Sequence, residues 1–256
     1  MHTRAKDIAN WMKQQVSAAG ARGIAVGLSG GIDSAVVAGL AAQATRGSVI
    51  GVIMPCHSDP VDQAHATLTA ERFGVPAVVV DLAPAYDLLV RDYRGALDAL
   101  PGTFHVAPAS EVDPKARMPL ANVKPRLRMA TLYFVANSLN YLVAGTGNRS
   151  ELTIGYFTKY GDGGVDMLPI GRLLKSEVRA VARELDVPQA IIDKPPTAGL
   201  WAGQTDEGEM GFTYVDLEAY LTKGPDAVPS ALAQTIQRLQ RTSEHKRAVP
   251  PMPPEG

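Results

Sequence analysis

The sequence predicts an α/β protein, a three-layer sandwich in which helices cover both faces of a parallel sheet. Short, continuous runs of valine, isoleucine and alanine recur between residues 23 and 146. Such runs are typical of strands that are buried on both faces, and they do not alternate with polar residues as a half-exposed strand would. Segments with helical spacing of apolar residues separate the runs, and this alternation is the pattern of a parallel sheet.

The elements follow in order from the N-terminus. Residues 5–19 are predicted to form an amphipathic helix, because Ile8, Met12 and Val16 recur at helical spacing and Gly20 can end the helix. The strands are then expected at 23–28, 48–55, 77–82 and 141–146. The helices between them are expected at 33–44, at 61–74, in the stretch after residue 82, and at 122–139.

The remaining segments are described by their composition. Residues 105–121 are polar and contain proline, which favours a loop, and Asn122 is expected to cap the helix that follows. Residues 155–172 are rich in glycine and are predicted to form a mobile loop, and further helices are expected at 175–186 and 228–241. We expect one domain over residues 1–247 and a disordered, proline-rich tail over 248–256.

Composition excludes several classes of function. The chain has 256 residues, with 25 Lys and Arg against 26 Asp and Glu, so nothing favours a nucleic acid as partner. No run of 18 apolar residues predicts a membrane span, and the charged residues in 1–20 argue against a signal peptide. One cysteine, Cys56, excludes an internal disulfide and fits the cytoplasm; we interpret it as a packed thiol and not a nucleophile.

The most informative stretch follows the first predicted strand. "SGGIDS" (29–34) joins this strand to a helix, so its backbone N–H groups and the helix N-terminus are expected to form an anion site. The lysine of the common P-loop pattern is absent. Asp33 lies near the helix start instead, where it would repel a bare phosphate, and this favours a bound cation such as Mg²⁺. The predicted ATP-phosphate contacts are Gly27, Leu28, Ser29, Gly30, Gly31, Ile32, Asp33 and Ser34.

This loop resembles the fingerprint of the N-type ATP pyrophosphatases, which have an adenine nucleotide alpha hydrolase-like fold. Five further blocks resemble the bacterial NAD synthetase family: "NVKPRLRM", "GTGNRSE", "GYFTKYGDGGVD", "PIGRLLKSEVR" and "KPPTAGLWAGQTDEGEMGF". They occur in order over most of the chain. The resemblance implies that the protein amidates deamido-NAD with ammonia to give NAD, and that ATP is converted to AMP and diphosphate through an acyl-adenylate.

The resemblance also assigns residues. It implies that Asp33 and Glu151, at the ends of two predicted strands, hold Mg²⁺. Thr146, Lys175 and Thr197 are implied to contact ATP, and Lys175 supplies the positive charge that the loop lacks. The implied deamido-NAD contacts are Arg126, Lys159, Asp166, His245 and Lys246, and the implied catalytic residues are Asp33, Asp166 and Lys175. We interpret Arg128 as part of a solvated helix face.

The nitrogen source and the assembly are further expectations. The chain begins one helix before the ATP loop, so we expect no glutaminase within it and free ammonia as the donor, with a partner glutaminase as an open question. The resemblance implies a homodimer. The predicted helix 122–139 is either part of its interface or an ordinary sheet-covering helix.

Three alternatives to this function stay open. The first is another ligase with the same loop, similar to GMP synthetase. The second is a non-catalytic sensor of adenine nucleotides. The third is a hydride-transfer enzyme, suggested by the partial dinucleotide fingerprint "GTGNRS", although Ser150 replaces its last glycine.

Overall fold

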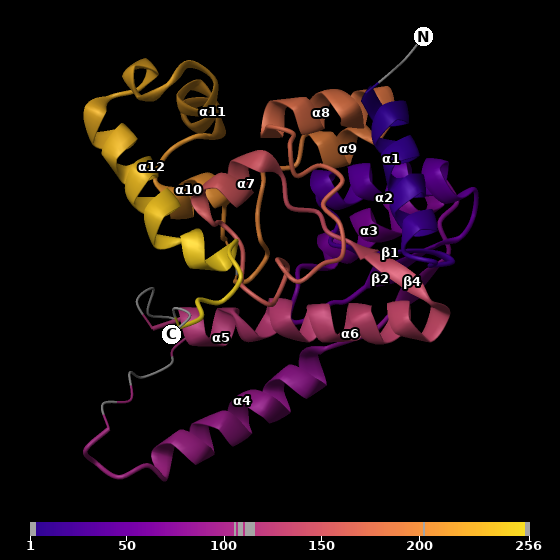
Figure 1. The fold of residues 1–256 in the computed structure, drawn as a ribbon. Coiled ribbons are helices and arrows are strands. Elements are labelled where there is room, and N and C mark those ends of the chain that lie inside the picture. Colours follow the sequence, from indigo (N-terminus) through magenta and orange to yellow (C-terminus); the bar gives the residue numbers. More distant parts are fainter. Residues whose placement is uncertain (1–3, 105, 107–109, 111–115, 202, 254–256) are drawn as a thin grey trace.

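A parallel four-stranded sheet in the order β3-β2-β1-β4 lies at the centre of the molecule (Figure 1). The computed structural model describes residues 4–104, 106, 110, 116–201 and 203–253. The strands are β1 (Gly23–Leu28), β2 (Val49–Ile53), β3 (Ala77–Val79) and β4 (Tyr141–Ala144). The helices are α1 (Arg4–Ala18), α2 (Ile32–Thr45), α3 (Pro60–Phe73), α4 (Ala83–Asp98), α5 (Met118–Ala121), α6 (Val123–Leu139), α7 (Arg149–Ile154), α8 (Lys175–Glu184), α9 (Gln189–Ile192), α10 (Asp206–Met210), α11 (Tyr214–Lys223), η1 (Pro225–Ala227), α12 (Ser230–Thr242) and η2 (Glu244–Lys246).

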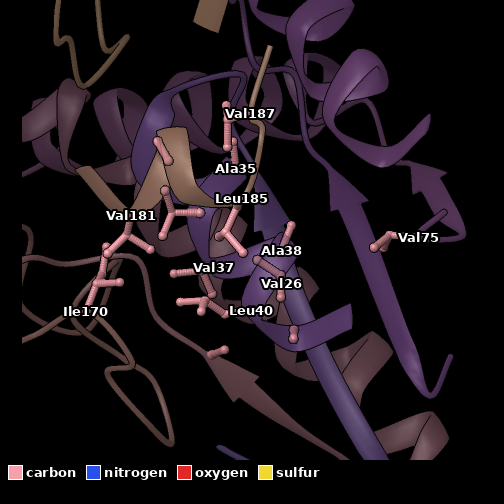
Figure 2. Packing of buried hydrophobic residues seen from close by; sticks show 14 of the residues in the cluster. Val26, Ala35, Val37, Ala38, Leu40, Val75, Ile170, Val181, Leu185 and Val187 are labelled. Carbon is pink, nitrogen blue, oxygen red and sulfur yellow. The ribbon is translucent and has the colours of Figure 1, made fainter. Parts of the chain in front are cut away.

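Helices cover both faces of the sheet, as predicted. On one face, α2 packs against β1, and α1, α8 and α9 pack against α2; buried side chains of these elements belong to one apolar cluster (Figure 2). On the other face, α4 and α6 contribute to a second cluster that includes Ala25, Val52 and Val143. Successive residues of a strand point to opposite faces, so a strand buried on both faces must be apolar throughout. The three-layer prediction is therefore confirmed.

Several predicted boundaries differ from the structure. β2 ends at Ile53, yet Met54 and Cys56 beyond it are buried, because the chain enters an apolar loop and the hydrophobic run outlasts the strand. β3 and β4 are likewise shorter than predicted, and α5 lies inside the segment predicted as a loop, of which residues 105, 107–109 and 111–115 lie outside the described residues. Helices α9, α10 and α11 were not predicted.

The capping role predicted for Asn122 is wrong. Its side chain caps no backbone group of α6; its Oδ1 accepts a hydrogen bond from Thr158 Oγ1 at 2.8 Å. The backbone of Asn122 is helical, because α5 leads directly into α6 and leaves no extended residue for a cap.

The C-terminal helices pack on α7 and not on the sheet. Ile154, Phe212, Leu217 and Ile236 form a third apolar cluster, which joins α7 to α11 and α12. Gly155, with φ +70°, ends α7, and a Cβ atom there would lie 2.1 Å from Ser243 Cβ. Only glycine allows this close approach, so α7 and the segment before η2 are in direct contact.

Cys56 is packed, as the sequence interpretation proposed. Its side chain is buried in the second apolar cluster, and burial raises the pKa of its thiol. The neighbouring His57 Nε2 lies 2.7 Å from Asp87 Oδ1. No helix in the described part of the chain is long and apolar enough to span a bilayer.

Candidate active site

A cavity of about 550 Å³ lies at the carboxyl ends of β1, β2 and β4. Crevices at this edge are the usual ligand sites of open parallel sheets. Distant segments of the chain line it together: the 27–34 loop, the start of α3, α6, α7, the 194–206 segment and η2. Of the residues predicted for the site, the cavity is lined by Gly27, Leu28, Ser29, Gly31, Ile32, Asp33, Ser34, Arg126, Thr146, Glu151, Lys159, Lys175, Thr197, His245 and Lys246. Gly30 and Asp166 do not line it.

The 29–34 loop has the shape of an anion cradle. Gly30 adopts φ +76°, and a Cβ atom there would lie 2.2 Å from the carbonyl oxygen of Asp62, so this residue shapes the loop without lining the cavity. The hydroxyls of Ser29 and Ser34 lie 3.1 Å apart and brace the turn. No side chain caps the start of α2 at Gly31, which leaves the N-terminal N–H groups of this helix for a ligand.

The acidic end of the cavity surrounds one buried lysine. Lys175 is 2% exposed, and its Nζ lies 2.5 Å from Asp33 Oδ2 and 3.3 Å from Glu151 Oε1. Burial by itself would lower the pKa of this ammonium, but Asp33 and Glu151 outweigh burial and raise it. Burial, followed by the charges of Asp33 and Asp206, raises the pKa of Glu151 to about 8 in spite of Lys175.

Asn148 joins the two predicted metal ligands. It caps α7 by accepting a hydrogen bond from Glu151 N at 3.1 Å, and Glu151 Oε2 accepts one from Asn148 N at 3.2 Å. This is a capping box. The side-chain amide of Asn148 also donates to Asp33 Oδ1 at 3.0 Å. α7 was not predicted, although Asn-x-x-Glu in "NRSE" is a signal that could have predicted its start. The capping box explains this part of "GTGNRS" without a dinucleotide fingerprint.

The N-terminus of α8 positions Lys175. The first N–H groups of a helix lack partners within the helix. Here Leu174 N donates to Glu177 Oε2 at 2.8 Å, Lys175 N to Ser150 Oγ at 3.3 Å, and Ser176 N to Glu218 Oε1 at 2.8 Å. The first of these hydrogen bonds caps α8 itself, and the other two connect α8 to α7 and α11, so the orientation of Lys175 depends on both neighbours.

We expect Glu177→Ala to destabilise the protein by about 1 kcal/mol at neutral pH, the usual cost of a lost helix cap. Partial burial by itself would raise the pKa of Glu177. The hydrogen bond from Leu174 N and the nearby Arg4 outweigh burial and lower this pKa. A carboxyl group whose pKa is lower in the folded state stabilises the protein at any pH above its ordinary, unfolded-state pKa. This stability is lost as the pH falls through the folded-state pKa. The difference between variant and wild type should therefore shrink in acid, as measured by urea unfolding.

Arg4→Ala is the matched control. It removes the exposed ion pair, in which Arg4 Nη1 lies 2.7 Å from Glu177 Oε1, but keeps the cap. Exposed pairs contribute about 0–1 kcal/mol. An Arg4→Ala variant as unstable as Glu177→Ala would show that the ion pair, and not the cap, supports α8.

Asp206 is a site residue that the sequence did not reveal. It is 4% exposed and lines the cavity, and burial raises its pKa. Its Oδ2 accepts a hydrogen bond from the Tyr214 hydroxyl at 2.8 Å, whereas its Oδ1 has no hydrogen-bond partner among the described residues. It lies in "QTDEGE", which also contains Glu207 and Glu209, and nothing in the sequence distinguishes Asp206 from these two acidic neighbours.

Other segments of the cavity wall carry cations whose hydrogen-bond partners are neutral. Lys159 Nζ donates to His245 O at 2.5 Å, and Arg126 Nη2 to Lys159 O at 3.4 Å. Lys246 Nζ donates to Gly155 O at 2.7 Å and to Phe157 O at 2.8 Å. Within the described residues, no carboxylate lies within 4.0 Å of these three cations. Asp162 and Glu209 also line the cavity and act on Lys246 through their charge, but neither forms an ion pair with it. The three cations are therefore available to an anionic ligand.

The interpretation of Arg128 as a solvated residue is wrong. Its guanidinium lines the cavity and donates to Met54 O at 3.1 Å and to Ser58 Oγ at 3.2 Å, and burial lowers its pKa. Helical spacing was the signal that could have placed it. Arg128 is four residues before the buried Leu132, whereas Arg126 lies on a more exposed face, at the rim of the cavity.

Asp166 lies away from the cavity. Its Oδ1 accepts a hydrogen bond from the Tyr133 hydroxyl at 2.9 Å, and its Oδ2 accepts one from Val143 N at 2.7 Å. Both contacts hold the carboxylate against the edge of β4 and the side of α6. Its role toward a ligand stays a prediction.

The carboxylates of Asp33 and Glu151 are suitable ligands for Mg²⁺. Both are oxygen donors, and both lie within 4.0 Å of the same cation, the ammonium of Lys175. The described part of the chain has no group of three or more His, Cys, Asp or Glu side chains arranged for a metal ion. Mg²⁺ is commonly bound by one or two carboxylates together with substrate phosphates, so the pair is sufficient.

Comparisons with known proteins agree with this geometry. A family model described as NAD synthase matches residues 4–250. The NH(3)-dependent NAD(+) synthetase of Carboxydothermus hydrogenoformans is 48% identical over 98% of this chain and 96% of that protein. Two solved structures cover most of both chains: the NMN synthetase of Francisella tularensis (34% identity, TM-score 0.86, 98% and 97%) and the NAD+ synthetase of Burkholderia pseudomallei (30%, 0.72, 96% and 90%).

Proposed function

The chain belongs to the NAD synthase family, and on this premise we propose that it is an ammonia-dependent NAD synthetase. It amidates the nicotinate carboxylate of deamido-NAD and converts ATP to AMP and diphosphate. The observation that supports this function best is the polarity of the cavity. The wall of one cavity contains an anion cradle with buried carboxylates and, in other segments, cations whose hydrogen-bond partners are neutral. A triphosphate with a metal ion suits the first group, and an anionic dinucleotide suits the second.

The proposed chemistry needs activation of the carboxylate, because ammonia would only deprotonate a free acid. The nicotinate carboxylate attacks the α-phosphorus of ATP, and pyrophosphate leaves. Ammonia then attacks the carbonyl carbon of the acyl-adenylate, and AMP leaves. The residues act by placing the two substrates and by neutralising charge, which are the main contributions of proteins to phosphoryl and nucleotidyl transfer.

The residue roles follow from position. The backbone N–H groups of the 29–34 loop and the ammonium of Lys175 would hold the phosphates of ATP, and Thr146 and Thr197 line the same cavity. Asp33 and Glu151 would hold Mg²⁺, which when bound neutralises charge on the phosphate oxygens. Arg126, Lys159, His245 and Lys246 would contact deamido-NAD, and Arg128 joins this set by its position in the cavity.

We propose a homodimer in the cytoplasm as the working state. Exposed apolar side chains on α4 and α6, helices that lie on the same side of the sheet (Figure 1), support an interface there. Phe134 on α6 is 75% exposed, and Leu88, Tyr93 and Leu97 on α4 are also exposed. A single buried cysteine is consistent with a reducing compartment.

The decisive test is a comparison of substrates with the purified protein. ATP, Mg²⁺ and ammonium are incubated with deamido-NAD, with XMP, or with nicotinic acid mononucleotide, and AMP and the amide product are quantified. We expect NAD from deamido-NAD, no product from XMP, and no activity when glutamine replaces ammonium. The mononucleotide arm matters because one similar structure is an NMN synthetase.

Each arm also has an outcome that contradicts the proposal. AMP release with XMP and not with deamido-NAD would favour the GMP synthetase-like alternative. A higher kcat/KM with the mononucleotide would assign the smaller substrate. ATP binding without pyrophosphate release under any condition would favour a sensor.

A further inference from the structure

A second, partly buried cation adjoins the phosphate cradle. Lys194 Nζ forms an ion pair with Asp62 Oδ1, and the two side chains are only 19% and 20% exposed. Both residues line the cavity. Neither was a predicted site residue, and the resemblance described above assigns no role to either.

The ion pair lies close to where the cradle would hold a phosphate. The carbonyl oxygen of Asp62 would lie 2.2 Å from a Cβ atom at Gly30, so the backbone of α3 touches the turn of the loop. Lys194 is three residues before Thr197 and belongs to the segment that lines the same cavity. The ammonium of Lys194 is therefore held beside the cradle by a carboxylate.

The charges already present in the site do not neutralise a bound triphosphate without a further cation such as Lys194. Lys175 is shared between Asp33 and Glu151, so its positive charge is already compensated before ATP binds. ATP adds several negative charges to a region that also contains Asp62 and Asp206. A triphosphate in a partly buried site requires further cations, because uncompensated charge is costly away from water.

The ion pair is not the sole attachment of its segment. Lys124 Nζ donates to Leu200 O at 2.8 Å, and the guanidinium of Arg117 lies 4.6 Å from the ring centroid of Trp201. Gln204 Oε1 accepts a hydrogen bond from Leu200 N at 2.8 Å. Asp206 N also donates to Pro196 O at 3.0 Å. These contacts hold the described residues of the segment independently of Asp62, so Lys194 can change partner while the segment stays in place.

We propose that Lys194 is a second phosphate-binding cation for ATP, which Asp62 holds beside the cradle until the triphosphate arrives. On binding, the ammonium exchanges the carboxylate of Asp62 for oxygens of the β- and γ-phosphates. This inference rests on the proposed function, because it assumes that ATP occupies the cradle. Asp62 thereby competes with ATP for the lysine.

The competition gives opposite expectations for the two partners. Lys194→Met should weaken ATP binding by about tenfold to a hundredfold, the range for a lost hydrogen bond to a charged group, and should leave AMP binding unchanged. Asp62→Asn should tighten ATP binding, because it frees Lys194 and removes a negative charge. Isothermal titration calorimetry with a non-hydrolysable ATP analogue and with AMP measures both, and Lys194→Arg should retain most of the affinity.

An exposed lysine far from the cavity lining serves as the control for Lys194. Lys13→Met removes an exposed lysine of α1 and should change neither affinity. Equal weakening of ATP binding by both partner variants, or no weakening by Lys194→Met, would overturn the inference and leave the pair as a structural contact. A wild-type protein that fails to bind ATP or to form NAD would contradict the proposed function instead.

Discussion

Lys175→Met should lower kcat by about a hundredfold to a thousandfold, the range for removal of one preorganised donor to a developing negative charge. The ammonium of Lys175 is the nearest cation to both Asp33 and Glu151, at 2.5 Å and 3.3 Å. In the proposed function this ammonium stabilises the leaving pyrophosphate, so its removal should slow pyrophosphate release. Steady-state pyrophosphate release at saturating ATP measures the effect on kcat.

The same variant should also lose stability. Removal of one partner from a buried ion pair typically costs about 3–5 kcal/mol, because the remaining charge is left uncompensated. For a chain of this size, that corresponds to a fall in Tm of about 10 °C. Differential scanning fluorimetry in the absence of ligands measures it.

The loss should depend on pH. The pKa of Glu151 is raised to about 8, so between its ordinary pKa and about 8 the folded state binds a proton that the unfolded state has released. The free energy of unfolding therefore falls as the pH rises through this range. Lys175 opposes this effect by stabilising the charged carboxylates, so its removal should cost more at about pH 8 than at about pH 5.

A double variant separates the two roles of the lysine. Adding Glu151→Gln to Lys175→Met removes one of the stranded carboxylates, so it should restore part of the stability without restoring kcat. A Lys175→Met protein with wild-type stability at every pH would contradict the buried ion-pair cluster. Wild-type kcat would contradict the proposed role toward pyrophosphate.

Lys246→Met should raise the KM for deamido-NAD by about tenfold to a hundredfold, while the affinity for ATP stays unchanged. The Lys246 ammonium donates only to the carbonyls of Gly155 and Phe157, and burial lowers its pKa. A partly buried cation with neutral partners gains strongly from an anionic ligand. Kinetics with each substrate varied in turn give both values.

The structural contribution of Lys246 can be distinguished from ligand binding. Lys223→Met, at an exposed position of α11, is the control and should leave both KM values unchanged. Lys246→Arg keeps the charge and should recover part of the affinity for deamido-NAD. If Lys246→Met weakened ATP and deamido-NAD equally, the lysine would only anchor η2 to α7.

The sequence by itself determined the architecture. Continuous apolar runs and helical spacing of 3.6 residues are local properties of the chain, so β1 and α2 were predicted almost to the residue. The anion loop was also predicted, because a strand–glycine–helix turn is itself a local structure. The predicted end of β2 was wrong, because the hydrophobicity of a residue indicates that it is buried and not that it pairs with a neighbouring strand.

The tertiary structure alone decided which side chains meet. Lys175 joins Asp33 across 142 residues of sequence, and Lys194 joins Asp62 across 132. No local pattern shows such partners, because packing of helices and loops on the sheet sets their distance. The ion pairs around Lys175 and the carbonyl partners of Lys246 both follow from that packing, since an electrostatic interaction depends on separation in space and on burial.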